Sequence, residues 1–349
     1  GKEEAEGQQA DKPQPLGHVL FQMGHSLNGK AYESYQKCCQ GLARLGYVVL
    51  AFDPMGQGER TYYGIRNADE EHSRPGRQLL LVGDTATRFQ VWDAVRSLDV
   101  LAAHPMVDAR RLASTGQSGG GTLTMLLAAV DSRLACAVVS SGNTENFACA
   151  GFNAPGSTDD AEQNLIASGP IGFDRWDLLY PLAPKPLLIL ASERDSFGTY
   201  SPSYVQSGEE EFEKLKRVYT LLGKPDQLEW ATTALPHGLT HQLRLHTYRF
   251  FQRWLMGATA AASKAVAEPE VNPEPESNLL VGVKPARVVM AKPTPAPVDR
   301  ASLASLLRAD APAQPKLSVF SRELGERCRI ETIEVGSAPG VFLPAYLFL

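Results

Sequence analysis

A serine, an aspartate and a histidine, in that order along the chain, are the residues with the clearest potential for chemistry. Ser118 occurs in Gly116-Gln117-Ser118-Gly119-Gly120, which fits the pattern G-x-S-x-G. A hydroxyl is a weak nucleophile at its own pKa, so it needs a neighbouring base, and the base needs an acid to orient it. Asp195 and His237 have the types for these two roles. The set predicts acyl transfer through a serine nucleophile.

The surroundings of Ser118 fit a nucleophile better than a plain turn. A nucleophile elbow joins a strand to a helix, and the flanking glycines leave room for the strained turn that exposes the serine. Arg111–Thr115 is predicted to be that strand and Leu123–Val130 that helix. The alternative is a glycine-rich turn that only packs a helix on a strand.

Two carboxylates compete for the role of the triad acid. Glu193 and Asp195 both follow the apolar run Pro186–Ala191, at the carboxyl end of a predicted strand. Asp195 lies further into the turn and is favoured, with Glu193 as the alternative. The acid would fix the imidazole tautomer and stabilise the imidazolium that forms.

His237 is the predicted base because it follows the strand Leu228–Thr232 and precedes Gly238, in a loop before the last helix. The other histidines have no such setting. Those on or near the closing helix are assigned to core or surface, and the rest to structural positions: His241 and His246, then His18, His72 and His104.

An oxyanion hole needs two backbone donors. One is predicted to be the Gly119 amide, which follows the nucleophile. The other is predicted to be the His25 amide, in the loop Met23-Gly24-His25-Ser26 after the first strand. The alternative for His25 is an ordinary surface turn residue. No side chain is assigned to substrate binding.

The remaining motifs indicate structure rather than chemistry. Asp53–Arg60 ends a strand in a glycine turn, but lacks the Lys-Ser/Thr of a P-loop and the helix start of a dinucleotide fingerprint. The five cysteines show neither metal-ligand spacing nor a disulfide framework and are interpreted as buried or idle thiols. No His, Cys and Asp cluster has the spacing of a metal site, so no metal is predicted.

Apolar strands alternate with amphipathic helices over the first 255 residues. This alternation predicts an α/β fold with a mostly parallel central sheet and helices on both faces. The strands are expected at His18–Met23, Tyr47–Phe52, Arg111–Thr115, Ala135–Ser140, Pro186–Ala191 and Leu228–Thr232, and the helices at Tyr32–Leu45, Phe89–Ala103, Leu123–Val130, Glu210–Leu222 and His241–Leu255.

Composition divides the 349 residues into a core and a tail. Residues 1–257 are the predicted catalytic core, in which 143–176 forms either a lid-like insertion or a connector. Residues 258–320 are rich in Ala, Pro and Glu and are predicted to be a linker with one short helix at Ser302–Leu307. Residues 321–349 contain two predicted strands, Cys328–Val335 and Val341–Leu349.

A net charge of −5 argues against nucleic acid or an anionic membrane as the main partner, because Lys and Arg are not in excess. No apolar run has the length of a membrane-spanning helix, and the polar residues Gly1–Pro15 do not resemble a signal peptide. The compartment is therefore not predicted.

Several stretches resemble the acetyl xylan esterase-like and dienelactone hydrolase-like group of α/β-hydrolases. They are GHSLNGKAYESYQKCCQGLARLGYVVLAFDPMGQGER, VRSLDVLAAHPMVDARRLASTGQSGGGTLTMLLAAVDSRL, PLLILASERD and PHGLTHQLRLHTYRFFQRWL. The resemblance spans Gly17 to about Leu255. It implies a serine esterase carried on Ser118, Asp195 and His237, with no cofactor and often with acylated sugars as substrates. Met23-Gly24 replaces the usual His-Gly after the first strand.

A second departure concerns the order of the strands. Proteins of this group begin with further strands before the one at His18, whereas here CRIETIEVGSAPGVFLPAYLFL at the C-terminus resembles those opening strands. We therefore expect a circularly permuted arrangement, in which the tail completes the sheet edge in its own molecule or, by strand exchange, in a homo-oligomer. A fragment of a tandem hydrolase is the alternative.

The sequence thus predicts a carboxylic ester hydrolase that works through an acyl-enzyme on short-chain, acetyl-type esters, carbohydrate esters among them. Two rivals remain. A serine peptidase of the prolyl-oligopeptidase type shares the elbow and the order of the triad, and a non-catalytic hydrolase fold would serve as a binding module.

Overall fold

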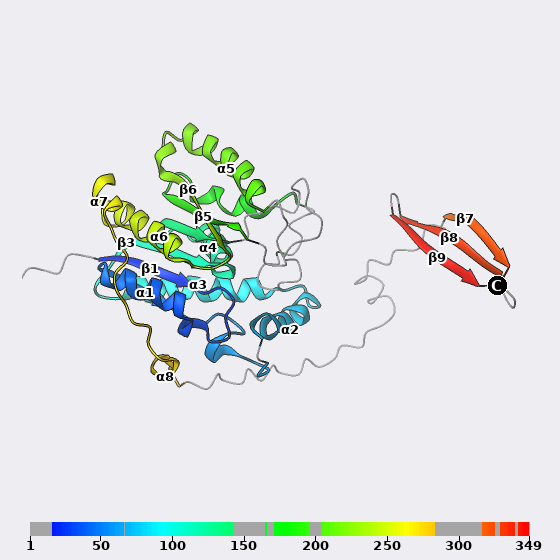
Figure 1. The fold of residues 1–349 in the computed structure, drawn as a ribbon, viewed down its shortest axis with the longest axis horizontal. Coiled ribbons are helices and arrows are strands. Elements are labelled where there is room, and N and C mark those ends of the chain that lie inside the picture. The colour runs from blue at the N-terminus through cyan, green and yellow to red at the C-terminus, as the bar shows by residue number, and fades with distance from the viewer. Residues whose placement is uncertain are drawn as a thin grey trace, which may run out of the picture. The chain divides into compact units, whose positions relative to one another are not determined.

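The computed structural model describes residues 16–65, 67–142, 165, 171–195, 204–282, 316–324, 329–338 and 341–348. The chain divides into two compact units, Gly1–Ala286 and Arg287–Leu349. The strands of the first unit lie at its centre with helices around them (Figure 1).

The first unit contains a six-stranded, entirely parallel sheet in the order β2-β1-β3-β4-β5-β6. The prediction of a parallel α/β sheet is confirmed. Its strands are β1 (Leu16–Gln22), β2 (Tyr47–Ala51), β3 (Val107–Gln117), β4 (Leu134–Ser140), β5 (Leu187–Arg194) and β6 (Leu228–Pro236). Its helices of five or more residues are α1 (Glu33–Arg44), α2 (Ala68–Leu80), α3 (Ala86–Ala103), α4 (Gly119–Val130), α5 (Tyr204–Leu221), α6 (His241–Trp254) and α7 (Ala260–Lys264).

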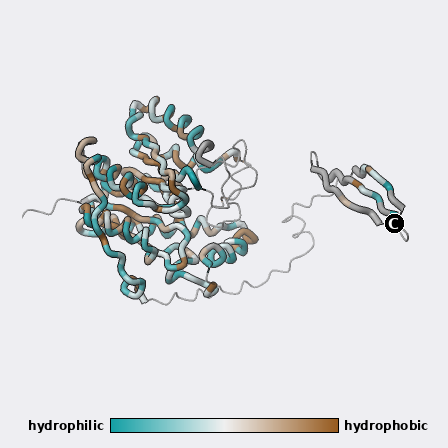
Figure 2. Tube along the Cα trace, viewed as in Figure 1, coloured by the Kyte–Doolittle hydropathy of each residue, from teal (hydrophilic) through white to brown (hydrophobic). Residues whose placement is uncertain are grey.

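Helices cover both faces of the sheet, because successive side chains of a strand point to opposite sides. One face packs against α1 and α6, with Leu42 and Phe251 in the same buried cluster as Val19. The other packs against α3, α4 and α5, with Leu98 beside Leu20. Hydrophobic residues concentrate along the central strands, and hydrophilic ones lie on the outer turns of α5 (Figure 2).

Helix α4 starts at Gly119, directly after Ser118, and not at Leu123 as the sequence predicts. Three glycines at its start disguise the helix, because glycine disfavours helix interiors. Helix α2 is not predicted at all, since its sequence ADEEHSRPGRQLL contains Pro75 and few apolar residues.

The first part of the predicted linker is packed on the core. We call residues 258–282 the strap; it contains α7 and the short helix α8 (Glu276–Leu279) and runs from α7 past α1 to α8 (Figure 1). Gln36 of α1 bonds the backbone of Glu274 at 3.0 and 2.7 Å. The Glu59 carboxylate accepts from the amides of Val281 and Gly282, each at 3.1 Å. A composition typical of a linker therefore conceals an ordered segment.

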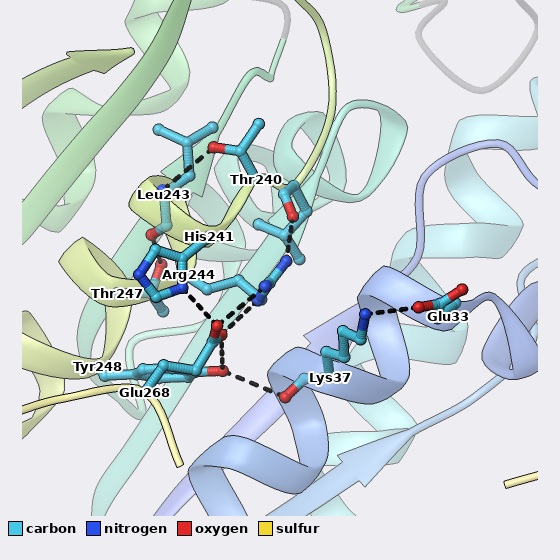
Figure 3. Close-up of polar contacts among 10 residues, drawn as sticks. Glu33, Lys37, Thr240, His241, Leu243, Arg244, Thr247, Tyr248 and Glu268 are labelled. Atoms are coloured by element: carbon cyan, nitrogen blue, oxygen red, sulfur yellow. Dashed lines mark hydrogen bonds and ion pairs between the residues drawn. The ribbon is translucent and has the colours of Figure 1, made fainter. Parts of the chain in front are cut away.

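A single carboxylate fastens the middle of the strap. Glu268 pairs with Arg244 and His241 of α6 and accepts from the Tyr248 hydroxyl at 3.2 Å, as Figure 3 shows. Burial favours the neutral acid, but the hydrogen bonds from Arg244 and then His241 outweigh it and lower the pKa of Glu268. Arg244 itself is almost fully buried, so the strap supplies the counter-charge it needs.

The second unit contains a three-stranded antiparallel sheet, β7 (Lys316–Leu324), β8 (Arg329–Ala338) and β9 (Val341–Phe348), in the order β7-β8-β9. The strands β8 and β9 correspond to the two predicted ones. Strand β7 begins within the predicted linker. Completion of the larger sheet by this tail, in the same molecule or in a partner, stays a prediction.

Two predicted features fall largely or wholly outside the described residues. Of the insertion 143–176, only Leu165 and residues 171–176 are described; its end forms a short 3-10 helix that buries Trp176. The expected helix at Ser302–Leu307 lies entirely outside them.

Candidate functional site

Ser118 occupies a strained turn between β3 and α4. Its backbone dihedrals are φ 60° and ψ −123°, a region that side chains other than glycine rarely adopt. Such a conformation costs about 1–3 kcal/mol and persists only where the surrounding structure enforces it. The Ser118 amide donates to the Ser140 carbonyl at 3.0 Å, and the Ser118 carbonyl accepts from Thr122 at 3.0 Å. These bonds hold the serine at the carboxyl end of the sheet.

The enforcement comes from backbone packed on backbone. A Cβ on Gly120 would lie 2.0 Å from the Gln22 carbonyl oxygen, and one on Gly116 would lie 2.3 Å from the Gly120 carbonyl oxygen. Only glycine permits β1, β3 and the start of α4 to approach this closely. The glycines of the motif thus build the turn, as its pattern predicts.

His237 and Asp195 are joined by a hydrogen bond of 2.7 Å between the histidine Nδ1 and the aspartate Oδ2. Asp195 follows β5 and its side chain is fully buried, whereas the His237 side chain, in the loop between β6 and α6, is 15% exposed. With Nδ1 donating to the carboxylate, the imidazole carries its lone pair on Nε2. This is the arrangement of an oriented general base.

Glu193, the alternative acid, has a different partner. It is exposed, and its carboxylate accepts from the Thr232 hydroxyl of β6 at 2.6 Å. The reason is strand alternation: Ser192 is buried and Glu193 points the other way. After the strand ends, a turn closed by the Asp195 amide and the Ser192 carbonyl at 3.1 Å directs Asp195 inward.

The loop after β1 packs directly on the nucleophile. A Cβ on Gly24 would lie 2.9 Å from the Ser118 Cβ and 2.3 Å from the Gln117 carbonyl oxygen. The Ser26 amide donates to the buried Gln57 side chain at 2.7 Å, so it is committed elsewhere. Gly119 is the first residue of α4. Both predicted oxyanion donors therefore belong to segments that border Ser118.

The turn Asp53–Arg60, interpreted from the sequence as structural, braces this loop. The buried Asp53 carboxylate accepts from the Lys30 amide at 2.7 Å and from the Lys30 ammonium at 2.6 Å. The same ammonium contacts Glu59 at 2.6 Å. This carboxylate then bonds the end of the strap, so one chain of polar contacts links the strap to the loop beside Ser118.

The sequence analysis missed one pairing near the site. His72 of α2, interpreted as structural, stacks on His25, the residue whose amide is a predicted oxyanion donor. No local signal reveals the pair, because α2 itself was not predicted. His18 is structural as expected: it is fully buried and accepts from the Asp108 amide at 2.6 Å, and burial lowers its pKa to about 4.

Other chemistries find little support within the described part of the chain. No group of three or more His, Cys, Asp or Glu side chains there could hold a metal ion. No helix there combines the length and the hydrophobicity needed to cross a bilayer. Three cysteines, Cys38, Cys39 and Cys136, are present there as thiols, and burial raises the pKa of each.

Comparisons with known proteins agree with this geometry. Residues 26–147 match the family model described as acetyl xylan esterase. Over 256 residues the chain is 25% identical to YtaP of Bacillus subtilis (strain 168), a protein named as a hydrolase; the match covers 69% of this chain and 79% of YtaP.

Solved structures agree on the fold. Methylesterase BT1017 has a TM-score of 0.56 at 22% identity, over 77% of this chain and 55% of that one. A carbohydrate esterase family 15 glucuronoyl esterase from Caldicellulosiruptor kristjansonii has a TM-score of 0.51 at 20% identity, over 74% and 73%. The chain thus spans just over half of the methylesterase.

The two structural likenesses establish the fold, and the expected α/β-hydrolase architecture is confirmed. The family match and the similarity to YtaP support a carboxylic ester hydrolase. The chain is therefore an acetyl xylan esterase-like member of the α/β-hydrolase superfamily.

Proposed function

We propose that this protein hydrolyses carboxylic esters through a Ser118–His237–Asp195 triad and an acyl-enzyme intermediate. The observation that carries the proposal is the 2.7 Å bond between His237 Nδ1 and the buried Asp195, at the sheet edge where the strained Ser118 turn lies. An oriented imidazole and a strained serine have no structural need for one another, but together they fit acyl transfer.

In the first half-reaction, His237 Nε2 takes the Ser118 hydroxyl proton as Oγ attacks the ester carbonyl carbon. The carbonyl oxygen becomes an oxyanion, which the amides of Gly119 and His25 stabilise. The intermediate collapses, the C–O bond to the alcohol breaks, and His237 returns its proton to the departing alcohol. Ser118 is left acylated.

In the second half-reaction, water gives a proton to His237 and attacks the acyl carbon. The new tetrahedral intermediate releases Ser118, which regains the proton, and the carboxylic acid departs. Asp195 remains a carboxylate throughout: it holds the tautomer with hydrogen on Nδ1 and stabilises the imidazolium in both steps.

For the substrate we propose short acyl groups, of the acetyl type, on a carbohydrate or small-molecule alcohol. The support is the acetyl xylan esterase model and the names of the two structural relatives, a methylesterase and a glucuronoyl esterase. A series of p-nitrophenyl esters of rising chain length, with acetylated sugars beside them, tests this proposal. A preference for long acyl chains would contradict it.

Replacement of the nucleophile tests the mechanism. Ser118→Ala is expected to lower kcat on p-nitrophenyl acetate by at least about 10³-fold, because no acyl-enzyme can form. Thermal melting checks that the variant is folded. Turnover close to that of the unmodified protein would refute the assignment. Faster cleavage of aminoacyl-p-nitroanilides than of esters would instead point to the peptidase alternative.

Replacement of the two carboxylates provides a matched pair. Asp195→Asn keeps the shape but favours the wrong tautomer, so kcat is expected to fall about 10³- to 10⁴-fold. Glu193→Gln alters only an exposed contact to Thr232 and is expected to keep kcat within about twofold. Reversal of these two outcomes would make Glu193 the acid.

A further inference from the structure

Two imidazoles from different elements meet beside the candidate nucleophile. His25 lies in the loop after β1, and His72 lies near the start of α2. Their rings are stacked, with centroids 4.7 Å apart and planes 19° from parallel. Their Nε2 atoms are 3.2 Å apart, so one ring donates and the other accepts. The contact combines a fixed orientation with a hydrogen bond.

The His72 end of this contact is rigid. His72 is fully buried, and a Cβ on Gly56 would lie 2.8 Å from its amide nitrogen, so α2 packs tightly on the Asp53–Arg60 turn. The adjacent Glu71 is also fully buried, and its carboxylate accepts from the amides of Tyr62 at 2.7 Å and Tyr63 at 3.0 Å. A buried carboxylate with several amide donors anchors the helix.

The His25 end borders the nucleophile. Its neighbour Gly24 is packed against Ser118 and Gln117, and its other neighbour, Ser26, is bonded through its amide to Gln57. The backbone of His25 is thus held on both sides, and its ring is held by His72. A donor amide at this position acts only if its direction is fixed, because a displaced donor loses most of its effect in the transition state.

We propose that His72 is a positioning residue for ester hydrolysis: its imidazole holds the ring of His25 so that the His25 amide faces the developing oxyanion. This inference rests on the proposed function. It extends that function to α2, a helix that contributes nothing else to the reaction, and it gives the His25 side chain a role beside that of its backbone.

Two replacements of His72 separate the hydrogen bond from the packing. His72→Gln places an amide group near the position of the imidazole Nε2 and keeps a donor or acceptor there. His72→Phe keeps a stacked ring and the volume but has no polar atom. A purely structural role would favour Phe over Gln, whereas a positioning hydrogen bond requires the reverse.

For His72→Phe we expect kcat on p-nitrophenyl acetate to fall about 10- to 100-fold with KM changed less than about threefold, because the ground-state ester does not use the donor. The inhibition constant of a short trifluoromethyl ketone, whose hemiketal oxyanion occupies the same place, is expected to rise by a similar factor. His72→Gln is expected to stay within about fivefold of the unmodified protein. The exposed His104, replaced by Phe, serves as a control.

A double-mutant cycle tests the route through His25. If His72 acts through that ring, His72→Phe added to His25→Ala has no further effect on kcat. Additive effects, a change confined to KM, or equal losses in His72→Phe and His72→Gln would overturn the inference. If His72→Phe melts below the assay temperature, His25→Phe probes the same contact from the half-buried partner, with the same expected kcat loss.

Ser118→Ala in the same assays separates the two proposals. An active Ser118→Ala variant would refute the proposed function itself. An inactive Ser118→Ala variant, together with a His72→Phe variant of unchanged kcat and unchanged ketone inhibition, would refute only the role of His72.

Discussion

The turn that carries Ser118 and the loop that carries His25 border one another but are held by different means. The first is fixed by main-chain atoms in contact with main-chain atoms at Gly116 and Gly120. The second is fixed by side chains that reach it from elsewhere: Gln57 and His72 directly, and Lys30 through Asp53. The nucleophile turn is thus determined within a few residues, whereas the loop depends on segments up to 47 residues away.

This difference teaches where each kind of damage should act. A wrong atom in the nucleophile turn has nowhere to go, so it should affect the whole fold. A lost contact on the loop should leave the fold standing and reduce its precision, with a smaller effect on stability and a direct effect on turnover. Four changes test this contrast, from the largest expected effect to the smallest.

Gly120→Ala is expected to be the most damaging. Its Cβ would lie 2.0 Å from the Gln22 carbonyl oxygen, which is backbone and cannot move aside. We expect a loss of more than about 3 kcal/mol in the free energy of unfolding, or no soluble protein. Gly223→Ala is the control, because its surroundings are open and only its positive φ of 70° is strained; it should cost about 1 kcal/mol. Equal losses, measured by urea unfolding, would remove the contrast.

Glu268→Gln tests how far the side-chain bracing extends. It leaves the nearly buried Arg244 without its counter-charge, and breaking such a pair costs about 2–4 kcal/mol. We expect a lower melting temperature but unchanged kcat on p-nitrophenyl acetate below that temperature. The double variant Arg244→Met with Glu268→Gln should recover part of the stability. A fall in kcat without a fall in melting temperature would contradict this view of the strap.

Gln57→Leu removes the acceptor of the Ser26 amide while keeping the buried volume. An unpaired buried amide costs about 1–3 kcal/mol, and the loop beside Ser118 should loosen. We expect kcat to fall about 10-fold with stability reduced by about 1–2 kcal/mol. Gln57→Glu, which keeps an acceptor, should lose less kcat. Unchanged kcat in Gln57→Leu would show that Ser26 is held without Gln57.

His18 gives the smallest effect, and only in acid. Its pKa of about 4 in the folded protein lies below the ordinary value of 6.5, so the folded state binds fewer protons than the unfolded one. Its contribution to stability is complete above pH 6.5 and is lost as the pH falls from 6.5 through 4. We expect about 1 kcal/mol of loss at pH 5.5 relative to pH 7.5 in urea unfolding. His18→Gln, which keeps an acceptor for Asp108, should lose less; parallel declines would exclude His18 as the cause.

Much of the architecture was predictable from the chain alone. The six strands of the central sheet, their parallel order and the turn around Ser118 follow from apolar runs and from glycines at fixed spacing, and both patterns act over a few residues. The strand ends also predicted that an acid and His237 would lie at one edge, because parallel strands all end on the same side.

Other features could not be predicted because their signals are not local. The linker-like composition of the strap does not reveal that Glu268 will neutralise a buried arginine, and ADEEHSRPGRQLL does not resemble an amphipathic helix, although Glu71 and His72 are its best-anchored residues. In both cases a polar side chain gains its value from a partner far away in the sequence.

By itself, then, the sequence determined which strands form, in what manner they alternate with helices, and that Ser118 would occupy a strained turn, since backbone conformation responds to neighbouring residues. Only the tertiary structure decided that Asp195 and not Glu193 meets His237, that His72 stacks on His25, and that the strap belongs to the core. The physical reason is that side-chain direction and desolvation are set by packing between distant segments, which no local pattern records.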